Sequence, residues 1–197
     1  MHEKTYASNL FVETIWPQIG LAREITLVLI GSWLIALLSQ MEIPLYPVPI
    51  TAQTLGVLLT AALLGSHRGT FAVLSYLGQG ALGLPFFAGG TAGFTRLTGP
   101  TGGYLVGFVV AAYVVGWLSE RGWDRRFATA AVAMLIGNVI IYAFGLPWLA
   151  NFVEWETVLK VGLFPFILGD LLKVCWAALA LSGIWAAGAF FRHRGLW

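Results

Sequence analysis

Two opposite charges, Asp170 and Lys173, lie within an otherwise apolar stretch that covers residues 164–191. The stretch is long enough to cross a bilayer, because about 20 helical residues at about 1.5 Å each span the hydrocarbon core. An ionised side chain there costs about 3 kcal/mol even on insertion scales that give low values. The three-residue offset places both charges on one helical face, so we expect them to pair and to point together into the protein. Such a pair indicates a substrate site; the alternative is a pair that only fixes helix packing.

The composition of the whole chain is that of a membrane protein. Of its 197 residues, 58% are hydrophobic and only 10% are charged, whereas soluble domains carry about 25% charged residues. We therefore predict a single integral membrane domain, residues 1–197, surrounded by the lipid bilayer. The net charge of +2 is small and the basic residues are dispersed, which argues against a nucleic-acid partner.

Six apolar segments are expected to form transmembrane helices of an all-α membrane protein, with loops that dip into the membrane on the extracellular side. The segments cover about residues 23–40, 51–64, 69–84, 101–119, 127–145 and 163–191. The second is short, since at about 1.5 Å per residue it extends about 21 Å, against about 30 Å for the hydrocarbon core. The preceding residues 43–50 contain three prolines and cannot form a regular helix. Irregular backbone at membrane depth lines a cavity or is covered by protein, and it often marks a transporter's binding site.

Two further connections, 85–100 and 147–160, have the composition of segments at the membrane surface. The first is rich in glycine and apolar for a loop, and the second mixes aromatic residues with glutamates, as in the aromatic belt. All the irregular loops fall on one side if six segments alternate. Most of the 11 Lys and Arg residues fall on the other side, namely Lys4, Arg23, Arg68, Arg121, Arg125, Arg126, Arg192 and Arg194. The positive-inside rule then predicts cytoplasmic termini and outward-facing loops.

Catalytic and nucleotide-binding motifs are absent from the sequence. Residues 78–83 match G-x-G-x-x-G, but they lie in an apolar segment with no preceding strand. None of the three lysines has the setting of a P-loop, so any active transport must draw its energy from a partner or a gradient. The three histidines lack further ligands at metal spacing, and Cys175 is the only cysteine. We therefore expect no enzyme activity, no metal, no cofactor and no disulfide within the chain.

Two features of the first apolar segment bear on processing and assembly. No small-residue cleavage pattern follows it, so we expect a retained helix and not a signal peptide. Ser32 and Ala36 are small residues four positions apart, a spacing that lets membrane helices approach closely. This surface is a weak candidate for contact with a partner protein.

Four stretches, in this order, resemble the BioY family: residues 47–59, 83–90, 99–108 and 169–173. BioY proteins are the biotin-specific S components of energy-coupling-factor (ECF) vitamin transporters, and the resemblance extends over residues 23–191. It implies a six-helix protein of a prokaryotic inner (plasma) membrane with an outward-facing pocket for biotin, the transported ligand. It also implies a transmembrane coupling protein and two cytoplasmic ATPase subunits as partners.

The resemblance implies that four polar residues are candidates for hydrogen bonds to the ureido ring of biotin. Asp170 would accept ureido N–H groups, and Lys173 would donate to the ureido oxygen or hold Asp170 ionised. Asn138 offers both donors and acceptors and could complete these contacts, or form an interhelical hydrogen bond instead. Gln53 could reach the ring or only cap the local backbone.

The remaining candidates concern the other parts of the ligand. Arg96 matches the geometry of the biotin carboxylate; the alternative is a surface arginine that holds its loop. The aromatic residues are predicted either to form pocket walls or simply to pack, and they are Tyr104, Phe94, Tyr46 and Tyr142. Gly93, with the neighbouring glycines, is expected to allow close backbone approach and loop movement.

Three other functions remain open from the sequence. The chain could be an S component for another small vitamin, such as riboflavin or thiamine. It could be a stand-alone secondary biotin transporter in which Asp170 relays protons. A membrane enzyme is the last alternative, because no nucleophile or metal constellation is recognisable.

Overall fold

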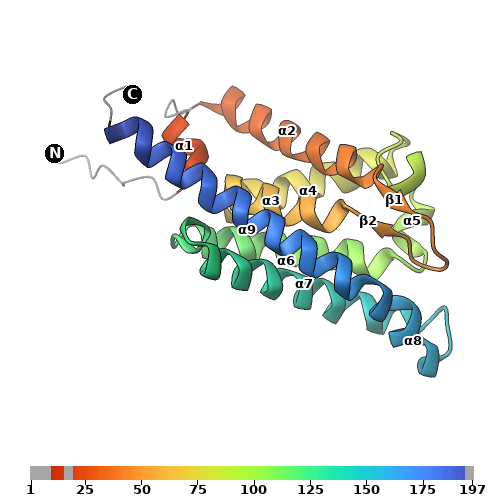
Figure 1. Cartoon of the computed structure of the whole chain (residues 1–197). Coiled ribbons are helices and arrows are strands. Elements are labelled where there is room, and N and C mark those ends of the chain that lie inside the picture. Colours follow the sequence, from red (N-terminus) through yellow and green to blue (C-terminus); the bar gives the residue numbers. More distant parts are fainter. Residues whose placement is uncertain (1–9, 16–19, 194–197) are drawn as a thin grey trace.

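The structure, a computed structural model, describes residues 10–15 and 20–193. Six long helices dominate it and run along one another (Figure 1). They are α2 (Leu21–Ser39), α3 (Gln53–Leu64), α4 (Ser66–Ala81), α6 (Gly102–Ser119), α7 (Phe127–Leu149) and α9 (Phe164–His193). The shorter helices are α1 (Phe11–Ile15), α5 (Thr95–Thr98) and α8 (Trp155–Gly162), with 3₁₀ turns η1 (Ala88–Gly90) and η2 (Trp123–Arg125).

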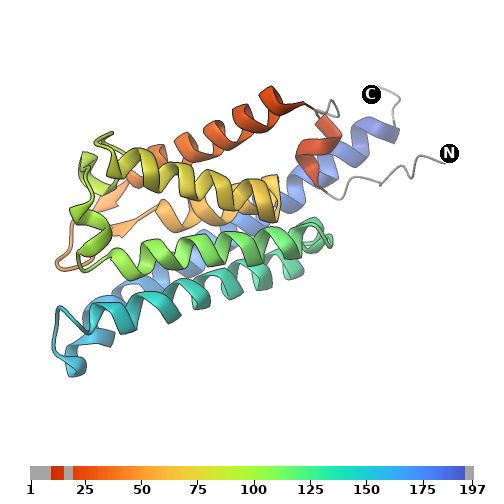
Figure 2. The same cartoon turned by 180° about the vertical axis from the view of Figure 1, so that it is seen from behind.

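The two ends of this bundle differ in character. The strands, α5 and α8 gather at one end, whereas α1 and the end of α9 lie at the other, in both views (Figures 1 and 2). The irregular connections are therefore on one side, as the alternation of six segments predicts. This arrangement collects the loops that surround the site described below.

The long helices lie where the apolar segments predict them, with boundaries that differ by a few residues. The largest extension is in α7, which continues through Pro147 to Leu149 instead of ending before the proline. So close to the end of a helix, the hydrogen bond that a proline removes is a small loss. Four stretches are long and apolar enough to cross a membrane, namely Leu21–Ser39, Gly102–Ser119, Phe127–Leu149 and Trp155–Gly188. The 12 residues of α3 and the 16 of α4 are shorter, so six crossings stay a prediction.

Regular structure in the loops departs from the sequence-based expectation in two places. The proline-rich loop is bounded by two short antiparallel strands, β1 (Glu42–Ile43) and β2 (Ile50–Thr51), so the fold is not purely α-helical. Residues 147–160 were expected to be an irregular loop, but they contain most of α8. Val158 and Gly162, four positions apart, face inward, and Trp155 is exposed, a pattern that is typical of an amphipathic helix.

The core lies around α6, which packs against α3, α4 and α7 and is the most buried of the candidate spans. Gly65 alone separates α3 from α4, and its φ of +87° is a conformation that glycine adopts without strain. A Cβ there would also lie 2.7 Å from Glu120 Oε1. The same carboxylate accepts hydrogen bonds from Ser66 N at 2.7 Å and Ser66 Oγ at 2.8 Å, so the start of α4 is fixed to α6.

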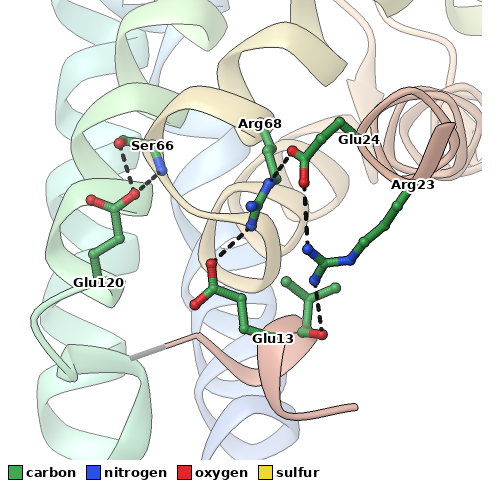
Figure 3. A network of polar contacts seen from close by, with 7 residues as sticks. Glu13, Arg23, Glu24, Ser66, Arg68 and Glu120 are labelled. Carbon is green, nitrogen blue, oxygen red and sulfur yellow. Dashed lines mark hydrogen bonds and ion pairs between the residues drawn. The ribbon is translucent and has the colours of Figure 1, made fainter. Parts of the chain in front are cut away.

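A polar network closes the end of the bundle that carries α1 (Figure 3). Arg68 of α4 bonds to Glu24 of α2 and to Glu13 of α1, the latter at 3.2 Å. Arg23 is buried beside them, 3.4 Å from Glu24 Oε1 and from the carbonyl oxygen of Val12. These contacts hold α1 against α2 and α4.

Candidate functional site

One cavity opens at the end of the bundle where the irregular connections lie. The space between its walls is about 680 Å³, a value that includes the open mouth of the cavity. Like most small-molecule sites, it combines mainly apolar walls with a few polar side chains. Helices α3, α6, α7 and α9 form its sides, and β2 with residues 87–101 covers it. Its apolar walls are Val48, Pro49, Phe87, Ala88, Leu105, Phe108, Ile141 and Phe166.

The predicted ion pair is formed and lines this cavity. Lys173 Nζ lies 2.8 Å from Asp170 Oδ1, and Asp170 is only 6% exposed. Both residues are on α9, three positions apart, so the helix itself brings them together. Lys173 Nζ also donates to Thr54 Oγ1 of α3 at 3.2 Å. The ammonium group therefore joins α9 to α3 at the cavity wall.

Tyr142 and Tyr104 both line the cavity, and they contact each other. Their rings meet edge to face with centroids 6.2 Å apart. The Tyr142 hydroxyl donates to Asp170 Oδ2, and the Tyr104 hydroxyl donates to the carbonyl oxygen of Gly162 at 2.9 Å. Gly145 of α7 makes room for the Tyr104 ring, since a Cβ there would lie 2.4 Å from it.

Arg96 reaches the same cavity from α5. It is exposed, and among the described residues no carboxylate forms an ion pair with it. The cavity thus carries one neutralised charge pair and one additional positive charge. An anionic group of a ligand would find its partner at Arg96.

Gln53, the first residue of α3, also lines the cavity. Its amide nitrogen donates to the Tyr76 hydroxyl, and its amide oxygen accepts from Thr51 Oγ1 at 3.3 Å. The side chain is therefore engaged within the protein and does not cap the helix backbone. Any bond that it makes to a ligand must use the remaining capacity of the amide.

Asn138 lies outside this cavity. It borders a separate small void together with Thr54 and Lys173. It is 7% exposed, and its Oδ1 has no hydrogen-bond partner among the described residues. The structure therefore does not show the interhelical bond to this oxygen that was one of the two alternatives, and it does not place the amide against the main cavity.

Three further predicted residues are also absent from the cavity lining. Tyr46 is 92% exposed and Phe94 is 66% exposed, so neither forms the predicted wall in this structure. Gly93 has a φ of +102° and donates its N–H to the carbonyl oxygen of Gly80 at 2.8 Å. It shapes the covering loop without lining the cavity. The composition of a loop does not show whether a given side chain points into the cavity or away from it. These positions therefore could not be distinguished, from the sequence, from the residues that line the cavity.

The sequence analysis missed Thr54 and Phe87. Thr54 follows Gln53 at the start of a short apolar helix, where a polar side chain is conspicuous. Phe87 is 3% exposed and packs edge to face on Tyr76 with centroids 5.6 Å apart. Its loop is held by α2, because Ser39 Oγ donates to the carbonyl oxygen of Phe86 and Gln40 Nε2 donates to that of Phe87.

The small residues of α2 also differ from expectation. Ser32 is fully buried and accepts a hydrogen bond from Gln79 Nε2 of α4 at 2.8 Å, and Ala36 is buried as well. This surface therefore packs within the chain, and it is not exposed for a partner protein.

Comparison with known proteins gives a consistent family assignment. The model of the BioY family matches residues 5–190. A protein named biotin transporter BioY from Thermotoga maritima is 42% identical over 154 residues, which cover 78% of this chain and 86% of that protein. Biotin transporter BioY2 from Lactococcus lactis subsp. cremoris is 38% identical over 151 residues, which cover 76% and 82%. Biotin transporter BioY from Rhodobacter capsulatus is 41% identical over 178 residues, which cover 82% and 93%.

A solved structure has the same fold. It is the crystal structure of the S component for biotin from an ECF-type ABC transporter, with a TM-score of 0.73 and 24% identity. The similarity covers 85% of this chain and 94% of that chain. The arrangement of helices is therefore that of an S component.

Proposed function

The chain belongs to the BioY family, and we propose that it is the biotin-binding membrane subunit for biotin uptake, energised by a separate ATPase coupling module. One observation carries the proposal. The buried Asp170–Lys173 pair and Arg96 line the same cavity, between apolar and aromatic walls. A ligand that fits must have hydrogen-bonding groups at one end, an anion elsewhere and an apolar body between them.

Biotin has these three parts. Asp170 accepts a ureido N–H, Lys173 donates to the ureido oxygen, and Arg96 binds the carboxylate. The thioether ring and alkyl chain lie against side chains such as Phe87, Phe108 and Phe166, which line the cavity. Each polar end of the ligand thus has a partner in the protein. An unpaired buried polar group would cost about 1–3 kcal/mol.

The relatives that define the family assignment are named transporters, so the chain is a multi-pass membrane transport protein and not an enzyme. We infer six membrane crossings with both termini in the cytoplasm of a prokaryotic cell. The end of the bundle that carries α1 also holds Arg23, Arg68, Arg121 and Arg125, which supports this orientation through the positive-inside rule. The outward end then holds the cavity and its covering loops, with the short helices α3 and α4 completed at membrane depth by irregular backbone.

A coupling module is inferred because the sequence has no P-loop of its own. Its components are a transmembrane coupling protein and two cytoplasmic ATPase subunits. The similarity in fold to an S component from an ECF-type ABC transporter supports a chain that binds the ligand while separate subunits hydrolyse ATP. Biotin is the transported ligand, and we expect no further cofactor.

Uptake of radiolabelled biotin tests the function. The chain is expressed in cells that lack biotin transport, together with the coupling proteins or with an ATPase pair whose P-loop lysines are replaced. We expect uptake with the active module and a strong decrease with the inactive one. Uptake that is independent of ATPase activity and abolished by a protonophore would contradict the coupling module and favour a stand-alone transporter.

A further inference from the structure

We infer that Tyr142 positions the Asp170 carboxylate through its hydroxyl group, and that this bond makes the site selective for ligands that present an N–H donor. The sequence suggests only the ring of Tyr142, as a candidate wall. The structure adds that its hydroxyl donates to Asp170 Oδ2. The inference rests on the proposed function, because it assigns a residue to the recognition of the same ligand.

The two oxygens of Asp170 have different partners. Oδ1 accepts from Lys173 Nζ at 2.8 Å, and Oδ2 accepts from the Tyr142 hydroxyl. An ionised carboxylate offers about four lone-pair positions, so both oxygens keep capacity for a further donor. Tyr142 therefore orients the acceptor without closing it to a ligand.

Both partners of Asp170 are themselves fixed to other helices. Tyr142 belongs to α7, and its ring meets that of Tyr104, whose hydroxyl donates to the carbonyl oxygen of Gly162 at 2.9 Å. Lys173 donates to Thr54 on α3 at 3.2 Å. The carboxylate is thus held between α3, α7 and α9, and it cannot turn away from the cavity without breaking one of these contacts.

This arrangement favours one kind of ligand group. A carboxylate that already accepts two donors is an acceptor with a fixed direction, which a ligand N–H can meet without reorganisation. A ligand with a methyl group in place of that hydrogen leaves the remaining lone pair unpaired in a buried site. Sites built to hydrogen-bond a ligand group discriminate strongly against analogues that lack it.

The test is a comparison of biotin with its two ureido N-methyl derivatives, measured by calorimetry on the full chain in detergent. Wild-type protein should bind at least one derivative much more weakly than biotin. Tyr142→Phe should weaken biotin binding by about tenfold, because a hydrogen bond to a charged group is lost. For the N-methyl derivative that binds more weakly, Tyr142→Phe should lower the affinity by less than about threefold, since that ligand does not bond to the oriented carboxylate. The ratio of the affinity for biotin to the affinity for this derivative is therefore smaller in Tyr142→Phe than in the wild type.

Two control variants separate positioning from packing. Tyr104→Phe removes a hydroxyl that bonds to Gly162 and not to Asp170, and it keeps the ring that contacts Tyr142. Any loss should therefore be equal for biotin and its derivative. Tyr113→Phe changes an exposed tyrosine of α6 that does not line the cavity, so both affinities should match wild type. The melting temperature of each variant checks its folding.

A double-mutant cycle gives a second measurement. In the Asp170→Asn background, Tyr142→Phe should cause little further loss of biotin affinity, because the bond that it removes serves the carboxylate. Equal losses for biotin and the derivative, unchanged or tighter biotin binding by Tyr142→Phe, or fully additive losses in the cycle would each overturn the inference. If wild-type protein binds no biotin at all, the proposed function itself fails. Binding of biotin without discrimination against either derivative overturns only the inference.

Discussion

Asp170 and Lys173 depend on each other because neither side chain has enough solvent to be stable as a lone ion. The Lys173 side chain is 17% exposed and that of Asp170 is 8% exposed. Removing one member of a buried pair costs about 3–5 kcal/mol, whereas replacing both members by neutral groups avoids most of this cost. The pair therefore affects stability and ligand binding in different ways.

This difference gives the first prediction. Lys173→Met leaves a buried carboxylate without its cation, so it should lower the melting temperature more than the double variant Asp170→Asn/Lys173→Met. Asp170→Asn alone should weaken biotin binding at least about tenfold, or about 1.4 kcal/mol, because a neutral amide replaces the charged acceptor for the ureido group. Thermal unfolding and calorimetry on the same preparations measure both effects. A double variant that is less stable than Lys173→Met would contradict the account of the pair.

Arg96 gives the second prediction, because it lines the cavity without an ion-pair partner among the residues that the structure describes. Arg96→Ala should weaken the binding of biotin more than that of biotin amide, since only biotin carries the anion that a guanidinium binds. Arg126→Ala, an exposed arginine at the opposite end of the bundle, is the matched control and should leave both affinities unchanged. Equal losses for the two ligands in Arg96→Ala would show that Arg96 does not bind the carboxylate.

Individual residues of this site could be predicted from the sequence where the residue type alone indicates a place in the protein interior. A charge in an apolar helix must find a partner, so Asp170 and Lys173 were found from their spacing. Arg96 stands out as the only charge in an apolar loop. The loop aromatics Tyr46 and Phe94 could not be placed in this way, because an aromatic side chain is equally stable in a pocket wall or at the membrane interface. Thr54 was missed because a threonine in an apolar helix can bond to its own backbone at little cost.

At the scale of elements, the packing of α6 against α7 sets the shape of the cavity. Tyr104 of α6 fits over Gly145 of α7, and it bonds to Gly162 at the end of α8. The absence of a side chain at Gly145 therefore determines where the ring of a cavity residue lies.

The third prediction concerns this contact. Gly145→Ala would place a Cβ 2.4 Å from the Tyr104 ring, so it should lower stability by about 1–3 kcal/mol and weaken biotin binding. Gly183→Ala on α9 is the control, because nothing lies within 4 Å of its added Cβ. Alanine favours the helix there, so stability should stay equal or rise. Thermal unfolding in detergent measures both, and an unaffected Gly145→Ala variant would argue against the packing described.

The elements themselves followed largely from hydropathy. Apolar segments are long and separated by charged or proline-rich connections, so the positions of the six long helices could be predicted to within a few residues. The strands β1 and β2, and helix α8, could not, because elements this short depend on the neighbours that they pack against. Whether α3 and α4 cross the membrane is also not decided by length, since both are shorter than a bilayer core requires.

For the whole molecule, the separation of its two ends determines how it works in a membrane. The cavity and its covering loops lie at one end, and the network of Arg68, Glu13 and Glu24 lies at the other (Figures 1 and 3). In the proposed orientation, a ligand taken up from outside would enter at the first end, and the cytoplasmic ATPase subunits would approach the second.

Cysteine labelling gives the fourth prediction. After Cys175→Ser removes the only cysteine, Glu154→Cys introduces a thiol in the exposed connection before α8, and Arg126→Cys introduces one at the opposite end. In intact cells, a membrane-impermeant maleimide should label only Glu154→Cys. Arg126→Cys should be labelled only after permeabilisation. The reverse pattern would show that the orientation is wrong.

The measurement that tests the central claim most directly is a calorimetric titration of the purified protein with biotin, with riboflavin and thiamine as comparison ligands, after any bound ligand has been removed. The account predicts one-to-one binding of biotin alone, with the affinity lost in an Asp170→Asn variant that is still folded at the temperature of the titration. Folded protein that does not bind biotin, or that binds it equally well without Asp170, would contradict the assignment of this cavity.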